Sequence, residues 1–154
     1  MESTGPQSSP PAEPGHEILG HTADVGLRAW GPDLASVFEE AAGALAELSA
    51  DPDVGAGHAA SETVTLQADD LVALAYGWLN ELIGLIDIRG PLLRVTLDEV
   101  AEGRSEWRLR ARVGLLPWDR ASTSRRLDLK SATYHRLSVA RIRGGWLLTA
   151  YLDV

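Results

Sequence analysis

The sequence predicts a single α+β domain in which a mainly antiparallel sheet packs with two helices. Some segments alternate apolar and polar residues, which indicates strands, and others repeat apolar residues at every third or fourth position, which indicates helices. Their order is ββαβα followed by a run of strands. Strands that are segregated from helices are typical of the α+β class. The length of 154 residues fits one domain.

The first half of the chain contains two expected strands and the first expected helix. Alternation predicts strands over 17–20 and 25–30, on either side of a turn at 21–24. Asp33 follows a Gly-Pro pair and is the expected N-cap of the helix. Its apolar positions recur at helical spacing and predict one buried stripe. They are Leu34, Val37, Phe38, Ala41, Ala42, Leu45 and Leu48.

A strand over 62–66 leads to a second helix, which Asp69 and Asp70 are expected to cap and which runs to about residue 87. Most of this helix is apolar, so we expect it to be buried on most of its surface. Its polar or small positions form a stripe: Gly77, Asn80, Glu81, Gly84 and Asp87. Because glycine lowers helix propensity, we expect the two glycines to permit close approach of another element.

The remainder of the chain is strand-rich. A hairpin is expected from 93–97 and 107–113, with a connection at 101–105. A short strand at 127–129 and a hairpin across 143–145, formed by 137–142 and 146–152, complete the pattern.

Composition excludes several kinds of site. The chain has no cysteine, so it has no disulfide, thiolate nucleophile or cysteine zinc site. Residues 1–15 lack both a basic residue and an apolar run, so we expect no secretory signal there; we expect a disordered tail and a domain over 16–154. Polar residues interrupt the most apolar segment, 71–88, so no membrane span is expected. We expect a cytoplasmic protein.

Charge is distributed unevenly along the chain. The net charge is −8, but residues 1–90 hold 15 acidic and 2 basic residues, whereas residues 91–154 hold 7 acidic and 12 basic residues. Such asymmetry suggests an acidic face and a basic face. The overall charge argues against a protein that grips nucleic acid over its whole surface, although a local basic contact stays open.

Acidic groups near both ends of the chain suggest a metal site. Asp24 lies in the turn His-Thr-Ala-Asp-Val-Gly, and Asp153 is followed by Val154, whose α-carboxylate we expect to act as a ligand. If the fold brings Asp24 to the end of the last strand, three negative oxygen groups converge, and a hard divalent cation is their natural partner. The alternatives are an Asx-turn at Asp24 and a solvated terminus at Asp153.

Two further groups have a functional and a structural interpretation. The segment 130–135 gathers Lys130, a hydroxyl, a phenol and His135, which suits an active site or, equally, cross-strand pairing with a solvated lysine. Arg108, Arg110 and Arg112 share one face of one expected strand. That row is either the solvated face of a sheet or a docking surface for phosphates or an acidic protein.

Four short segments, in this order and spacing, resemble the archease family over residues 16–154. They are His21-Thr22-Ala23-Asp24-Val25-Gly26, then Trp78-Leu79-Asn80-Glu81-Leu82-Ile83 with Asp87, then Lys130-Ser131-Ala132-Thr133-Tyr134-His135, and finally Leu152-Asp153-Val154. The resemblance implies an accessory factor, itself not an enzyme, of the RtcB-type RNA ligase that acts in tRNA splicing and RNA repair. Such factors promote the guanylylation and repeated turnover of the ligase.

The resemblance also implies a site. The metal ligands carry over onto Asp24, Asp153 and Val154, with calcium, magnesium or manganese as the divalent cation. From the chemistry of the residues rather than from the resemblance, the expected partner contacts are His21, Lys130 and His135 together with Arg108, Arg110 and Arg112. Contact with nucleic acid is expected to be indirect. The main alternative is a small metal-dependent phosphoester hydrolase that uses Asp24 and Asp153 with His21 or His135 as base. A metal-stabilised interaction domain with another partner is a third possibility.

Overall fold

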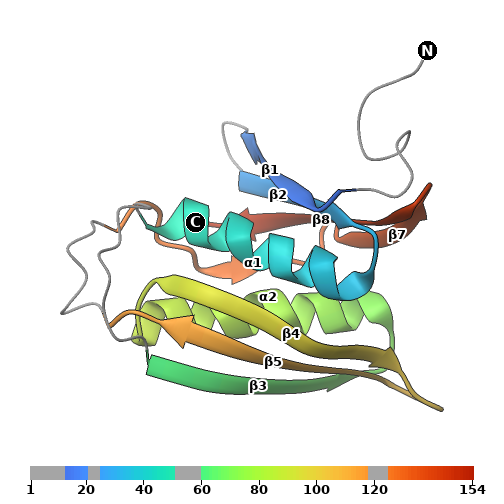
Figure 1. Ribbon diagram of the computed structural model, residues 1–154. Coiled ribbons are helices and arrows are strands. Elements are labelled where there is room, and N and C mark those ends of the chain that lie inside the picture. The colour runs from blue at the N-terminus through green and yellow to red at the C-terminus, as the bar shows by residue number, and fades with distance from the viewer. Residues whose placement is uncertain (1–12, 21–24, 51–59, 118–124) are drawn as a thin grey trace.

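The computed structural model describes residues 13–20, 25–50, 60–117 and 125–154. The predicted α+β class is confirmed, and the described strands form two antiparallel sheets rather than one. Both helices lie in a layer between the two sheets (Figure 1). Each helix therefore packs against one sheet on each of two sides, which explains why both helices have so many apolar positions.

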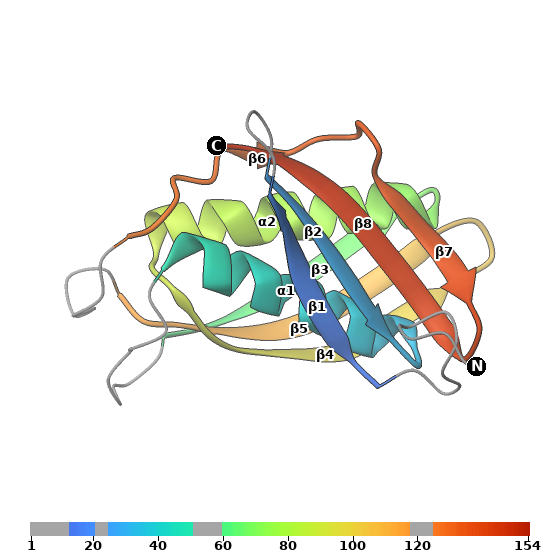
Figure 2. The ribbon, with the colours of Figure 1, turned by 90° about the horizontal axis from the view of Figure 1, so that it is seen from above.

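The larger sheet has five strands in the described part of the chain. β1 (Gly15–Gly20) pairs with β2 (Val25–Gly31), and β2 pairs with β8 (Gly145–Asp153). The other edge of β8 pairs first with β7 (Ser138–Ile142) and, near the end of β8, with β6 (Ser131–Ala132). β1, β2 and β8 cross above both helices in Figure 2.

The smaller sheet has the order β3–β5–β4, formed by β3 (Ala60–Ala68), β5 (Trp107–Leu115) and β4 (Leu92–Glu102). The predicted hairpin of β4 and β5 is confirmed. Register shifts between Leu92 and Arg94 and between Leu97 and Glu99 interrupt the simple alternation expected for β4. On β5 the alternation holds throughout, with its apolar residues turned toward the helices.

The first helix, α1 (Leu34–Ser49), begins at the predicted N-cap. The Asp33 carboxylate accepts from the N–H of Ser36 at 2.8 Å, and Ser36 completes a capping box. The helix ends against 125–127, where the carbonyls of Ser49 and Leu48 accept from the N–H groups of Arg126 and Leu127. The predicted strand at 127–129 is therefore wrong, because this segment satisfies the last carbonyls of α1 instead of joining a sheet.

The second helix, α2 (Leu71–Ile88), has Asp70 as its N-cap, with the carboxylate accepting from the N–H of Ala73 at 2.8 Å. By length and composition alone it could cross a membrane. In this fold it lies between the sheets and is a core helix. Its buried Trp78 donates from Nε1 to the carbonyl oxygen of Phe38 at 3.0 Å, which joins the two helices.

The two glycines of α2 do not mark a close approach. A Cβ added at Gly84 would meet nothing within 4 Å, and one added at Gly77 would lie 3.8 Å from Leu66, an ordinary contact. The expectation that these positions admit a neighbouring element is therefore wrong. Glu81, Gly84 and Asp87 face solvent, so this part of the predicted polar stripe is simply the exposed side of the helix.

The first strand begins close to the predicted start of the domain. Gly15 already belongs to β1, one residue before the expected start at residue 16. The expected tail falls mainly on residues 1–12, which lie outside the described residues.

Candidate metal and partner site at the end of β8

The start of β2 lies beside the end of β8. Val25 pairs with Leu152, and Gly26 pairs with Tyr151, whose ring covers the glycine so closely that an added Cβ would lie 2.7 Å from it. Asp24 precedes Val25 in the sequence, but Asp24 and His21 lie outside the described residues. The described part of the chain therefore fixes the neighbourhood that the predicted metal site requires, namely the first residue of β2 next to the last residues of β8.

Asp153 is exposed, and a short strand holds its backbone. It pairs with Ser131, and its carbonyl oxygen accepts from the N–H of Lys130 at 2.9 Å. The Ser131 hydroxyl donates to Oδ2 of Asp153 at 3.4 Å. Among the described residues, no Lys, Arg or His forms an ion pair with this carboxylate. An exposed carboxylate that no described cation neutralises suits a hard metal ion.

Asn80 of α2 positions this strand. Its Nδ2 donates to the carbonyl oxygen of Ala132 at 3.2 Å, and its Oδ1 accepts from the N–H of the same residue at 2.9 Å. Nδ2 also donates to the carbonyl oxygen of Tyr76 within the helix. One amide thus ties β6 to α2. Asn80 was predicted only as a polar position on the helix; a carboxamide in a largely buried helix was the signal of this role.

The rest of segment 130–135 serves mainly structural contacts. The N–H of Thr133 donates to the carbonyl oxygen of Tyr151, as expected for cross-strand pairing, whereas Tyr134 stacks on Tyr76 of α2 with ring centroids 4.0 Å apart. His135 is exposed in the turn that follows. No hydrogen bond or ion pair between described residues joins His135 to Asp153. Of the two predicted contacts in this segment, Lys130 lies next to Asp153, because their backbones are hydrogen-bonded. His135 lies in the adjoining turn.

The side chains of the described residues do not by themselves form a metal site. Within the ranges 13–20, 25–50, 60–117 and 125–154, no three His, Asp or Glu side chains form a group that could hold a metal ion. Of the three predicted ligands, Asp153 and Val154 are described, and Val154 is 42% exposed. The donor chemistry fits a divalent cation only if Asp24 and main-chain oxygen from Val154 join Asp153.

The predicted arginine row lies elsewhere. Arg108, Arg110 and Arg112 are exposed on β5, in the sheet on the other side of the helix layer (Figure 1). The residues singled out from the sequence therefore occupy two separate surfaces, one at the end of β8 and one on the smaller sheet.

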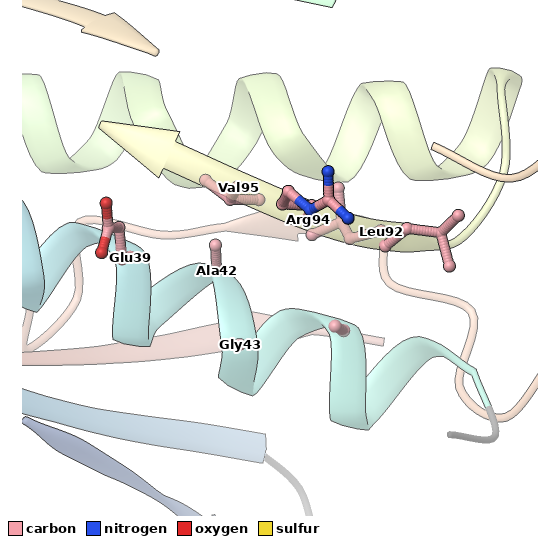
Figure 3. A pocket seen from close by; sticks show the side chains of 8 residues that line it. Glu39, Ala42, Gly43, Leu92, Arg94 and Val95 are labelled. Carbon is pink, nitrogen blue, oxygen red and sulfur yellow. The ribbon is translucent and has the colours of Figure 1, made fainter. Parts of the chain in front are cut away.

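A shallow pocket of about 120 Å³ lies between α1 and β4 (Figure 3). It is lined mainly by small and apolar side chains, with Glu39 and Arg94 as the charged residues. Glu39 accepts through Oε2 from the N–H of Leu97 at 2.9 Å. This bond covers a backbone donor on the edge of β4, which is a common way to protect an exposed strand edge. The pocket is thus explained by the packing of a helix against that edge.

His16 forms a cluster that sequence reasoning missed. Its Nδ1 lies 2.8 Å from Oε1 of Glu40, and its Nε2 lies 3.1 Å from Oε1 of Glu47. Burial favours the neutral imidazole, but the hydrogen bonds and charges of the two glutamates outweigh it, so the pKa of His16 is raised. Glu40 and Glu47 are seven residues apart on α1 and so share one face, which was the available signal.

Comparisons with known proteins agree on one family. Residues 16–154 match the archease protein family. The protein archease of Methanosarcina barkeri is 29% identical over 140 residues, which cover 90% of this chain and 95% of that protein. The protein archease of Methanopyrus kandleri is 32% identical over 142 residues, with 90% and 98% covered.

Two solved structures have the same fold. The solution structure of Methanobacterium thermoautotrophicum protein 1598 is 28% identical, with a TM-score of 0.73, and the match covers 91% of this chain and 99% of that one. The crystal structure of a Thermotoga maritima protein, described as an archease and possible chaperone, has a TM-score of 0.55 over 90% of this chain and 96% of that one. At 16% identity the second likeness shows the fold alone.

Proposed function

Because the chain belongs to the archease protein family, we propose that it is an accessory factor of an RtcB-type RNA ligase and that it binds a divalent cation at the end of β8. The observation that carries the proposal is the exposed Asp153 carboxylate, which no described cation neutralises, beside the strand that begins immediately after Asp24. Like charges at such a place favour a counterion.

The ligands in this proposal are Asp24, Asp153 and a main-chain oxygen of Val154, with calcium, magnesium or manganese as the ion. Carboxylate and carbonyl oxygens are the donors that these hard cations prefer, and water would complete the coordination. β6 supports the site, because the bonds from Lys130 and Ser131 hold the backbone and carboxylate of Asp153. The bound ion would supply positive charge beside the Asp153 carboxylate.

The role of this end of the domain is to act on the ligase. The ion either orders the surface that docks, with His21, Lys130 and His135 as contacts, or is presented to the ligase site. In both versions the ligase carries out the chemistry and the accessory protein has no turnover of its own. The protein would thereby promote guanylylation of the ligase and its repeated use.

The test is guanylylation of the ligase by GTP, with and without this protein. Asp153→Asn keeps the shape of the side chain but removes its charge, so it should lose both divalent-ion binding and stimulation; Asp24→Ala should behave alike. Asp128→Asn makes the same chemical change at another exposed aspartate and should retain both. Full stimulation by a folded Asp153→Asn protein, or phosphoester hydrolysis by the isolated wild-type chain, would overturn the proposal.

A further inference from the structure

The outer face of the three-stranded sheet carries a regular row of positive charge. Arg108, Arg110 and Arg112 lie at alternate positions on β5, the central strand, and all three are exposed. The helices pack on the opposite face of this sheet (Figure 1). Successive arginines are about 7 Å apart along the strand, because each residue of an antiparallel strand advances about 3.4 Å.

The strand on one side of the row adds neutral hydrogen-bonding groups. On β3, Thr63 pairs with Arg112, Thr65 with Arg110 and Gln67 with Arg108. All three β3 side chains are exposed. The half of the face formed by β3 and β5 therefore presents guanidinium, hydroxyl and amide groups side by side. These are the groups that proteins use to contact the phosphates and sugars of nucleic acids.

The strand on the other side forms an acidic border. Asp98 of β4 accepts two bonds from Nε of Arg112 and one from Nη2, the last at 2.9 Å, and Glu99 lies 3.7 Å from Nη2 of Arg108. Arg110, between them, forms no ion pair with a described residue. Both bridges are at the surface, where such pairs are weak and exchange readily with other anions. The acids orient the row and leave its β3 side open.

We propose that the β3–β5 half of this face binds the phosphate backbone of a single strand of nucleic acid, without reading its sequence. Regular spacing on an extended strand suits a regularly repeating anion better than the scattered carboxylates of an acidic protein. No outward position of β3 or β5 carries an aromatic ring, so base stacking does not contribute. The choice of RNA as the probe rests on the proposed function.

The test uses fluorescence anisotropy of a short labelled oligoribonucleotide with the full chain at several salt concentrations. Three phosphate contacts to a single strand predict that affinity falls about twentyfold between about 50 and 200 mM salt, because each contributes about 0.7 to the logarithmic slope. Replacing Arg108, Arg110 and Arg112 with Gln should flatten that dependence. Replacing Arg28, Arg141 and Arg143, which lie on the larger sheet or its turn, removes the same charge elsewhere and should leave the slope unchanged.

A substitution in the acidic border should strengthen RNA binding, whereas loss of the arginines should weaken it. Asp98→Asn releases Arg112 from its ion pair, so RNA binding should tighten several-fold, a gain that a merely structural role would not produce. Equal loss in both triple variants, or unchanged binding in the β5 variant, would overturn the proposal. Guanylylation of the ligase without RNA is the separate readout. Because the sequence also offered Arg108, Arg110 and Arg112 as contacts for a protein partner, this readout separates the two roles. A row that binds RNA leaves the stimulation by the β5 variant intact, whereas losing that stimulation while RNA binding persists would assign the row to protein docking instead.

Discussion

The side-chain amide of Asn80 bonds to both main-chain groups of Ala132, a residue that is only 2% exposed. A buried backbone donor or acceptor that loses its partner costs more than the bond itself contributes. Asn80 therefore determines where β6 lies, and through Lys130 and Ser131 it influences the surroundings of Asp153. It acts on the candidate site without being one of its proposed ligands.

Asn80→Ala should lower the free energy of unfolding by about 1–3 kcal/mol, because both groups of Ala132 lose their partner. Asn80→Asp should cost at least as much, since its carboxylate would face the carbonyl oxygens of Ala132 and Tyr76 with no proton to donate. Urea denaturation measures both changes. Equal stability of the alanine variant and the wild type would show that β6 does not depend on this amide.

His16 makes stability depend on pH. Its pKa is raised in the folded protein above the ordinary value of 6.5, so protonation favours folding. This stabilisation is complete below about pH 6.5 and disappears as pH rises through the raised folded pKa. His16→Gln removes the titrating group and should reduce the difference in unfolding free energy between about pH 6 and pH 8. Denaturation of both proteins across this range checks the sign, and an unchanged pH dependence would contradict it.

At the scale of elements, α2 combines a buried body with one exposed edge. Its length and apolar content are explained by its contacts with strands of both sheets and with α1, so no membrane environment is needed to explain them. Where the helix faces solvent, its residues are constrained by helix propensity more than by packing. A glycine on that edge is therefore a local weakness, whereas a glycine under a neighbouring ring is a packing requirement.

A pair of substitutions separates these two cases. Gly84→Ala should raise the free energy of unfolding by about 0.5–1 kcal/mol, since the added methyl group meets open space and the residue is helical. Gly26→Ala should lower it by about 1–3 kcal/mol, because the methyl group would displace the Tyr151 ring. Thermal or urea denaturation measures both. Destabilisation by Gly84→Ala would indicate that this edge of α2 is covered in the native protein.

At the scale of the molecule, the fold determines which charged residues lie on the same surface. Arg108, Arg110 and Arg112 are exposed on β5 of the smaller sheet, while Asp153 ends β8 of the larger one. The helices lie between the two sheets (Figures 1 and 2). The two proposed binding surfaces are therefore separate, and each can be altered without changing the other.

The proposed metal site predicts a specific effect of extending the chain. Adding residues after Val154 converts its carboxylate into a peptide group, which removes one charge from the site. Val154 is exposed, so thermal stability without metal should not change. Calorimetric titration with calcium or manganese should show weaker binding by the extended protein than by one ending at Val154. Equal affinities would leave Asp24 and Asp153 as the charged ligands.

Local patterns predicted most helices and strands, because these elements depend largely on residues that are close together in the sequence. Both helix caps followed from an aspartate before an apolar stripe, and the β5 alternation placed its arginines outward. The failures have tertiary causes: the segment 127–129 bonds to the end of α1, and β6 is held by Asn80 from a helix 52 residues away in the sequence. No periodicity in those segments reports such partners.

The sequence by itself determined the fold class, the helix caps, the exposed arginine row and the family, because alternation, capping and motif order are written along the chain. Only the tertiary structure decided that the strands form two sheets around the helices, that Val25 lies beside Leu152, and that Glu40 and Glu47 hold His16. These arrangements depend on which apolar faces pack together and which long-range hydrogen bonds result, and packing over long sequence separations leaves little trace in any local pattern.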